Sequence, residues 1–301
     1  MAERIAISVT VSGLSRLFGD DLSRVVELAR SADAAGIAQI ALPDHLAIGP
    51  RTDRYPYGRF PYRNDEPWLE PLVTLAALAS ATRRIRLATA VLVAPLRPAL
   101  LLAKTLATLD VLSRGRLDLG VGIGWQAEEF AGAGVPFAGR AARLDDTLRA
   151  CRVLWSGGPA SFDSPTLRFE ELWSLPRPVQ PGGIPIWFGV ALGERNVRRI
   201  AELGAGWMPI GAGPAELADG VRRLHDALRA AGRDPAELRV RAPAPAVRGA
   251  SGGIDLEATL HRLAGLRVAG ATHASFALDR FVRDASEIEP FLERLGAYTR
   301  E

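Results

Sequence analysis

Residues 85–121 read IRLATAVLVAPLRPALLLAKTLATLDVLSRGRLDLGV, and this stretch decides the fold class. Residues 85–93 form a strongly apolar stretch of strand length, residues 98–112 place leucine and alanine at helical spacing, and residues 116–121 are a further expected strand. A strand, a helix with an apolar face and a second strand in this order are typical of a parallel β–α–β unit. The stretch therefore predicts two parallel strands joined by a covering helix.

The same alternation runs from one end of the chain to the other. Further strands are expected at residues 5–11, 39–42, 184–188, 206–210, 238–242 and 273–277, and further helices at 21–35, 71–81, 141–155, 194–203, 214–231, 256–269 and 286–298. A hairpin-like excursion at residues 160–172 interrupts the rhythm. Eight strand and helix units favour a closed (β/α)₈ TIM barrel of the α/β class over an open doubly wound sheet. No linker rich in proline and glycine divides the chain, so residues 1–301 are interpreted as one domain.

Composition excludes several classes of protein. The 301 residues are 48% hydrophobic, which is enough for one large core, but no apolar run approaches the roughly 20 residues of a membrane span. The only cysteine is Cys151, which excludes a disulfide framework and a thiolate metal cluster. The net charge of +3 is modest, without the basic aromatic runs of nucleic-acid binding. We expect a cytoplasmic protein without a metal, whose partner is a small-molecule substrate.

Two connections, residues 43–70 and 122–139, are longer than the usual loop of about 2–6 residues. Both follow expected strands, so both should lie at the C-terminal face of the barrel, where active sites of this fold are built. The first connection contains aromatic residues and arginines, namely Tyr55, Tyr57, Phe60, Tyr62 and Trp68 with Arg51, Arg54, Arg59 and Arg63. It is a candidate lid over a bound aromatic system; an ordered structural loop with solvated arginines is the alternative.

Asp44 and His45 stand directly after the expected strand at residues 39–42, and both should point into the barrel mouth. A histidine there is a reasonable proton donor, because the unperturbed imidazole pKa of about 6.5 lets it exchange a proton at cellular pH. The alternative for an isolated pair is a buried, hydrogen-bonded histidine capped by an aspartate. The pair alone therefore does not decide between catalysis and packing.

Four further segments supply a context: ATAVLVAP (88–95), AKTLATLDVLSRGRL (103–117), GVGIGW (120–125) followed by Glu128, Glu129 and Phe130, and IPIWFG (184–189). In this order and spacing the chain resembles the luciferase-like monooxygenase superfamily, and most closely its coenzyme F420-dependent oxidoreductase branch, over about residues 5–295. The resemblance implies a barrel of the bacterial-luciferase type with insertions at its C-terminal face. It also implies a homodimer, because members commonly dimerise.

The resemblance implies site residues as well. In F420-dependent members a non-prolyl cis peptide supports the deazaflavin, and the matching bond is Ala90–Val91. Asp44 would lie near the cofactor, with His45 as a catalytic or cofactor-contacting group, and Gly122 follows in the glycine-rich turn. The family's phosphate site matches the helix-opening stretch Gly189, Val190, Ala191, Leu192, Gly193 and Arg195, although the serine of many relatives is missing. Ordinary turn chemistry is the alternative for its glycines.

Trp125 departs from one subgroup of this branch. Sugar-phosphate dehydrogenases place a glutamate directly after the glycine-rich turn, whereas tryptophan at this position favours an aromatic pocket wall. Glu128 and Glu129 follow in an expected helical turn, where a solvated face is the favoured interpretation. The glycines at 120, 122 and 124 lack the spacing of a dinucleotide fingerprint.

The function that the resemblance implies is hydride transfer between the deazaflavin C5 and a small organic substrate. His45 would exchange a proton with the substrate, Tyr57, Phe60, Trp68 and Trp125 would surround it, and the lid arginines would hold the anionic tail of F420. One alternative is an FMN-dependent monooxygenase whose reduced cofactor comes from a separate reductase. The other is a flavin- or deazaflavin-binding protein without turnover.

Overall fold

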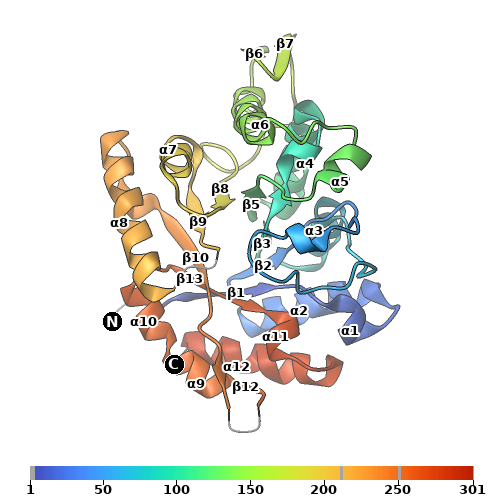
Figure 1. Cartoon of the computed structure of the whole chain (residues 1–301), viewed down its shortest axis with the longest axis vertical. Coiled ribbons are helices and arrows are strands. Elements are labelled where there is room, and N and C mark those ends of the chain that lie inside the picture. Colours follow the sequence, from blue (N-terminus) through green and yellow to red (C-terminus); the bar gives the residue numbers. More distant parts are fainter. Residues whose placement is uncertain (1–3, 211–212, 250–251, 301) are drawn as a thin grey trace.

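The computed structural model describes residues 4–210, 213–249 and 252–300 of the chain. Within these ranges the main sheet runs in the order β3-β2-β1-β13-β10-β9-β8-β5-β4, and an additional pairing of β3 with β5 closes it (Figure 1). Every pairing in this sheet is parallel. The strands are β1 (Ala6–Thr10), β2 (Gln39–Leu42), β3 (Arg86–Thr89), β4 (Leu92–Val93), β5 (Leu117–Gly122), β8 (Ile186–Gly189), β9 (Gly206–Met208), β10 (Arg239–Pro243) and β13 (His273–Ala277). β3 and β4 both pair with β5 and together count as one strand of the barrel, so the nine segments form eight strands. The predicted closed (β/α)₈ barrel is confirmed.

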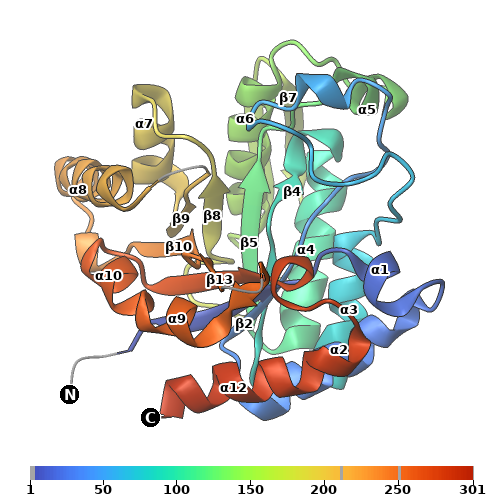
Figure 2. The ribbon, with the colours of Figure 1, turned by 60° about the horizontal axis from the view of Figure 1, so that its bottom comes forward.

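Helices cover the outside of the barrel (Figure 2). They are α2 (Val25–Ala35), α3 (Pro71–Ala81), α4 (Ala99–Ser113), α6 (Arg140–Leu154), α7 (Glu194–Leu203), α8 (Pro214–Ala230), α9 (Leu256–His261), α10 (Leu263–Val268) and α12 (Ile288–Arg300). α3 begins with a proline, and the Glu70 side chain caps it by accepting the Val73 N–H. Among the described residues, no helix is long and apolar enough to cross a membrane.

Several predicted elements differ from the structure in detail. The strand expected at residues 85–93 is divided into β3 and β4, and the peptide between them, Ala90–Val91, is cis, as the resemblance implied. The helix expected at 256–269 is divided into α9 and α10. α5 (Ala127–Gly132) contains the helical turn that was expected at Glu128 and Glu129. The short helices α1 (Leu14–Phe18) and α11 (Leu278–Phe281) and the pair β11 (Val247–Arg248) and β12 (Ile254–Asp255) were not predicted. Such segments are shorter than the window in which periodicity is recognised.

The expected excursion at residues 160–172 is an antiparallel hairpin, as predicted. β6 (Ala160–Ser164) pairs with β7 (Leu167–Leu172), and the hairpin projects from the barrel beyond α6 (Figure 1). It stands away from the strand ends that surround the barrel mouth. The hairpin therefore does not contribute to the site described below.

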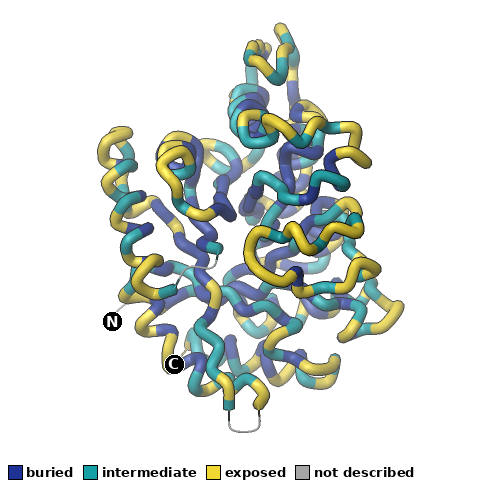
Figure 3. The backbone as a smooth tube through the Cα atoms, in the orientation of Figure 1, coloured by how far each residue is buried: buried dark blue, intermediate teal, exposed yellow. Residues whose placement is uncertain are grey.

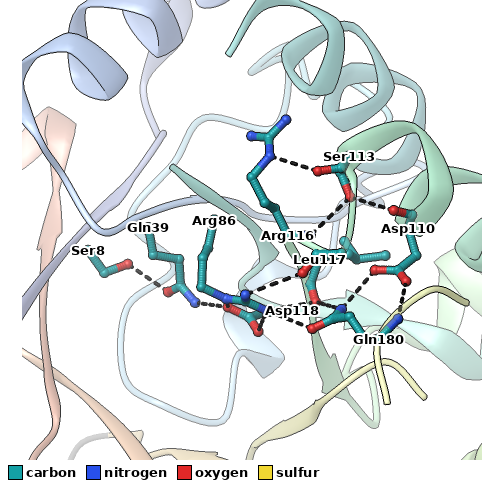
Figure 4. A network of polar contacts seen from close by, with 10 residues as sticks. Ser8, Gln39, Arg86, Asp110, Ser113, Arg116, Leu117, Asp118 and Gln180 are labelled. Carbon is teal, nitrogen blue, oxygen red and sulfur yellow. Dashed lines mark hydrogen bonds and ion pairs between the residues drawn. The ribbon is translucent and has the colours of Figure 1, made fainter. Parts of the chain in front are cut away.

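Buried residues gather on the strands and on the inner sides of the helices, and exposed residues lie at the periphery (Figure 3). The apolar core lies between strands and helices, whereas several residues that face the barrel interior are polar. Ile7 and Val9 belong to that core, and the alternate residues of β1, Ser8 and Thr10, face inward. The inward groups are hydrogen-bonded to one another: Ser8 Oγ donates to Gln39 Oε1 over 2.9 Å, and Gln39 Nε2 donates to Asp118 Oδ2 over 2.8 Å (Figure 4). This network supports the barrel beneath its mouth.

His273 predicts a pH dependence of stability. Burial lowers the pKa of His273 to about 4. The histidine of the unfolded chain, with a pKa of about 6.5, binds the proton more strongly. Stability is therefore fully present above about pH 6.5 and is lost, by at most about 3 kcal/mol, as the pH falls toward 4. Urea unfolding at pH 7 and pH 5 should show a smaller loss in His273→Gln than in the wild type. Equal losses in both proteins would exclude His273 as the cause.

Candidate active site

A cavity of about 660 Å³ opens at the carboxyl ends of the barrel strands. Its size is typical of small-molecule sites, and its position is the usual one for active sites of this fold. The following predicted site residues line it: Asp44, His45, Arg54, Tyr57, Phe60, Trp68, Ala90, Val91, Gly122, Trp125, Gly189 and Val190. Both long connections thus contribute to one cavity. The pair Asp44 and His45 after β2 and the Ala90–Val91 peptide after β3 lie at the same cavity.

The Val91 side chain lines this cavity and is called the Val91 platform below; two glycines leave it room. A Cβ atom on Gly122 would lie 2.6 Å from Val91 Cγ2, and one on Gly189 would lie 2.5 Å from Val91 Cγ1. These distances are far below van der Waals contact, so any residue larger than glycine at position 122 or 189 would displace the Val91 side chain. Gly122 and Gly189 therefore pack against the platform, and their predicted contact with a cofactor stays a prediction.

Asp44 is buried, and its carboxylate has no exposed surface. Asp44 Oδ2 accepts the Val93 N–H over 2.8 Å and Arg97 Nη1 over 2.7 Å, while Oδ1 accepts Arg97 Nη2 over 3.0 Å. Arg97 also donates to Glu70 Oε1 over 2.7 Å. Arg97 and Val93 thus occupy the Asp44 carboxylate, while the residue lines the cavity; its position near the cofactor stays a prediction. Asp44 fixes the backbone next to the Val91 platform.

His45 lies at the cavity wall within a ring of aromatic side chains. Its ring makes edge contacts with Trp68, Phe60 and Trp125 at centroid distances of 5.0, 5.9 and 6.1 Å. His45 Nδ1 lies 3.4 Å from Glu129 Oε2. When Nδ1 carries the proton that faces Glu129, Nε2 is left for proton exchange with a ligand. The imidazole therefore has the setting of a positioned acid–base group.

Glu129 is the partner that the sequence interpretation missed. Its side chain is only 1% exposed, and Oε1 accepts the Leu46 N–H over 2.6 Å, so the expectation of a solvated face is wrong for this residue. The short helix α5 turns it toward the start of the lid. Gln126, just before α5, makes a second bridge by accepting the Gly49 N–H over 2.8 Å. The connection after β5 thereby fixes the connection after β2.

The lid, residues 43–70, is ordered by aromatic contacts. Tyr55 and Phe60 approach Trp125 at centroid distances of 5.2 and 5.4 Å, and Tyr62 approaches Trp68 at 4.9 Å. The Tyr55–Trp125 and Tyr62–Trp68 pairs are edge-to-face and the Phe60–Trp125 pair is tilted, and aromatic pairs of this kind contribute about 0.5–1.5 kcal/mol each beyond burial. Trp68 Nε1 is buried and has no hydrogen-bond partner in the described part of the chain. This donor is therefore left unsatisfied within the lid.

The four lid arginines do not act as one cluster. Only Arg54 lines the cavity, where Nη1 lies 4.0 Å from Glu128 Oε1. Arg51 is exposed and bonds to Asp53 over 2.9 Å, and Arg63 is exposed and paired with Asp65. Arg59 is exposed and does not line the cavity. The expectation of a four-arginine clamp at the pocket is corrected accordingly, because neighbouring aspartates already neutralise two of the charges.

The predicted phosphate stretch is divided between two places. Gly189 and Val190 line the main cavity, whereas Ala191 and Leu192 line a neighbouring hollow. Gly193 is the residue before α7, where its N–H donates to Ala191 O over 3.2 Å, and the exposed Arg195 lines neither space. Arg223 of α8 lines the hollow and donates to Leu192 O over 3.3 Å. Arg223 thus places a cation at this hollow, whereas Arg195 does not, and the sequence analysis did not identify Arg223.

The fold and the cavity define a (β/α)₈ barrel with a small-molecule site at its C-terminal face, and the sequence profile of the luciferase-like monooxygenase family matches residues 4–267. The chain belongs to this family, as its motifs predicted. It is 33% identical over 273 residues to an uncharacterised protein of Mycobacterium tuberculosis, covering 89% of this chain and 91% of the relative.

Two further comparisons are with a curated enzyme and with a solved structure. The F420-dependent glucose-6-phosphate dehydrogenase of Gordonia bronchialis is 30% identical over 187 residues, covering 60% of this chain and 50% of that enzyme. The crystal structure of monooxygenase RslO1 from Streptomyces bottropensis superposes with a TM-score of 0.78 at 22% identity and 98% coverage of both chains. The family relation thus supports an oxidoreductase of the luciferase-like class.

Proposed function

We propose that this protein is an F420-dependent oxidoreductase that transfers a hydride between the deazaflavin C5 and a small organic substrate. The observation that supports it most is the His45–Glu129 pair, held in an aromatic cavity beside the Val91 platform. The family relation and the similarity to an F420-dependent enzyme support the choice of cofactor.

The cavity fits a planar tricyclic ring with an anionic tail. Its volume of about 660 Å³ accommodates a ligand of this size, and its walls are mainly apolar and aromatic. Val91 would support one face of the ring, and the aromatic side chains of the walls would pack around it. Arg54 at the rim offers a cation to the tail.

When bound, the deazaflavin supplies the hydride chemistry. His45 gives a proton to the substrate, or takes one from it, at the atom next to the hydride site, and Glu129 keeps its ring oriented. The rings of Phe60, Trp68 and Trp125 exclude water from this imidazole. Asp44 and Arg97 hold the backbone beside the platform.

Cofactor choice is the direct test of this function. We expect F420 to bind in the micromolar range or tighter, about −8 kcal/mol, and FMN to bind clearly more weakly in titrations under identical conditions. Tighter FMN binding with oxygen-dependent turnover would instead assign the FMN-dependent monooxygenase, with a separate reductase. Binding without turnover of any substrate would assign a binding protein. The homodimer and the cytoplasmic location stay predictions.

The lid gives a second prediction. If Arg54 holds the oligoglutamate tail, Arg54→Gln should weaken F420 binding at low salt and flatten its salt dependence, because such charge pairs are screened over about 10 Å at 0.1 M ionic strength. Arg51→Gln is the matched control, since Asp53 already neutralises Arg51. Isothermal titrations at 50 and 300 mM salt measure both variants. The same dependence of F420 affinity on salt in the wild type and in Arg54→Gln would show that Arg54 does not bind the tail.

A further inference from the structure

Arg241 of β10 is a cation buried at the floor of the cavity. The residue is only 6% exposed, yet it lines the cavity together with Thr10 and Ser275. Arg241 Nε donates to Ser8 Oγ over 2.8 Å, and Nη2 donates to Thr10 Oγ1 over 2.6 Å. The hydroxyls of Thr10 and Ser275 lie 3.2 Å apart. Two hydroxyls and a guanidinium thus form a polar floor beneath aromatic walls.

No carboxylate of the described residues forms an ion pair with Arg241. Asp118, the acid of the barrel interior, is engaged by Arg86 through two bonds of 2.8 and 2.7 Å and also accepts from Gln39 (Figure 4). Asp44 is engaged in the same way by Arg97. The floor of the cavity therefore has an excess positive charge.

This charge is present under ordinary conditions. Burial lowers the pKa of Arg241 to about 10, which still leaves the guanidinium protonated at neutral pH. Nη1 has no acceptor among the residues that the structure describes, since Arg241 bonds only through Nε and Nη2. A buried cation of this kind is stabilised when an anionic group binds to it.

We infer that the floor of the cavity is a carboxylate-binding subsite, formed by Arg241, Thr10 and Ser275, that selects a substrate with a carboxylate group. A guanidinium recognises a planar carboxylate through directional, charge-assisted hydrogen bonds, and a hydroxyl can add a further donor. The aromatic walls above it suit an apolar remainder of the molecule. Assigning the carboxylate to the substrate rests on the proposed function; the anion site itself does not.

Benzoate and benzamide test the subsite, because they have nearly the same shape and differ in charge. Isothermal titration of the cofactor-free protein should show benzoate binding about ten- to a hundredfold more tightly than benzamide. Arg241→Gln should abolish this preference. Arg239→Gln removes the same charge from an exposed position of the same strand and should preserve it. Ser275→Ala should reduce the preference, and it replaces Arg241→Gln if that variant does not fold.

Equal binding of the two probes to the wild type would overturn the subsite, as would an unchanged preference in Arg241→Gln. F420 titration shows whether the anion that binds Arg241 belongs to the substrate or to the cofactor. We expect Arg241→Gln to bind F420 within a few-fold of the wild type, whereas an F420 loss as large as the benzoate loss would overturn the assignment to the substrate. Failure of the wild type to bind F420, with benzoate still preferred, would reject the proposed function and support the subsite.

Discussion

His45→Ala should lower turnover about 10²- to 10⁴-fold while leaving F420 affinity within a few-fold of the wild type. A positioned acid–base group contributes on this scale, and the lost interaction belongs to the transition state. The aromatic rings around His45 increase the effect, because water has limited access to replace the missing proton donor. Steady-state kinetics at saturating F420, together with direct F420 titration, separates the two quantities.

Glu129→Gln is the matched control for this experiment. It keeps an acceptor for the Leu46 N–H and removes the charge beside His45 Nδ1, so turnover should fall less than in His45→Ala and its pH profile should shift. If His45→Ala loses F420 binding and keeps its rate at saturating cofactor, His45 is a binding residue. The proton must then come from another group, with Glu128 or water as the next candidates.

The barrel was predictable because strand and helix periods differ along the chain. β2, α3, α7 and β13 have the predicted bounds, since each has a strong apolar pattern between clear start and stop signals. The division of the third strand could not be derived from local sequence, because residues 85–93 contain no glycine, proline or other turn signal that would end a strand. Only the family resemblance indicated the cis bond there, and the structure confirms it.

The site was predictable in position and less so in its contacts. Strand order places every strand end at one mouth, so His45, Val91 and Trp125 meet as expected. Contacts between residues far apart in the sequence could not be predicted. Arg97 forms an ion pair with Asp44, and Glu129, from the connection after β5, lies beside His45. Arg241 gave no signal either, because an arginine in a strand does not reveal which side of the barrel it faces.

The second large effect should appear in Asp44→Ala, with a loss of about 3–5 kcal/mol of folding stability and weaker binding of F420. Removing one member of a buried ion pair leaves the other charge without compensation, and here that charge is Arg97, which keeps only Glu70 as a partner. The Val93 N–H also loses its acceptor, so the backbone beside the Val91 platform is no longer fixed. Urea unfolding and F420 titration measure the two consequences.

The double variant Asp44→Ala/Arg97→Met separates these consequences. Removing both charges takes away the uncompensated cation, so most of the lost stability should return, whereas the Val93 N–H still lacks its acceptor and F420 binding should remain weak. Recovery of both properties would show that Asp44 affects the cofactor only by neutralising Arg97. Wild-type stability in Asp44→Ala alone would mean that Glu70 suffices to compensate Arg97, and the ion pair would then have no structural role at the platform.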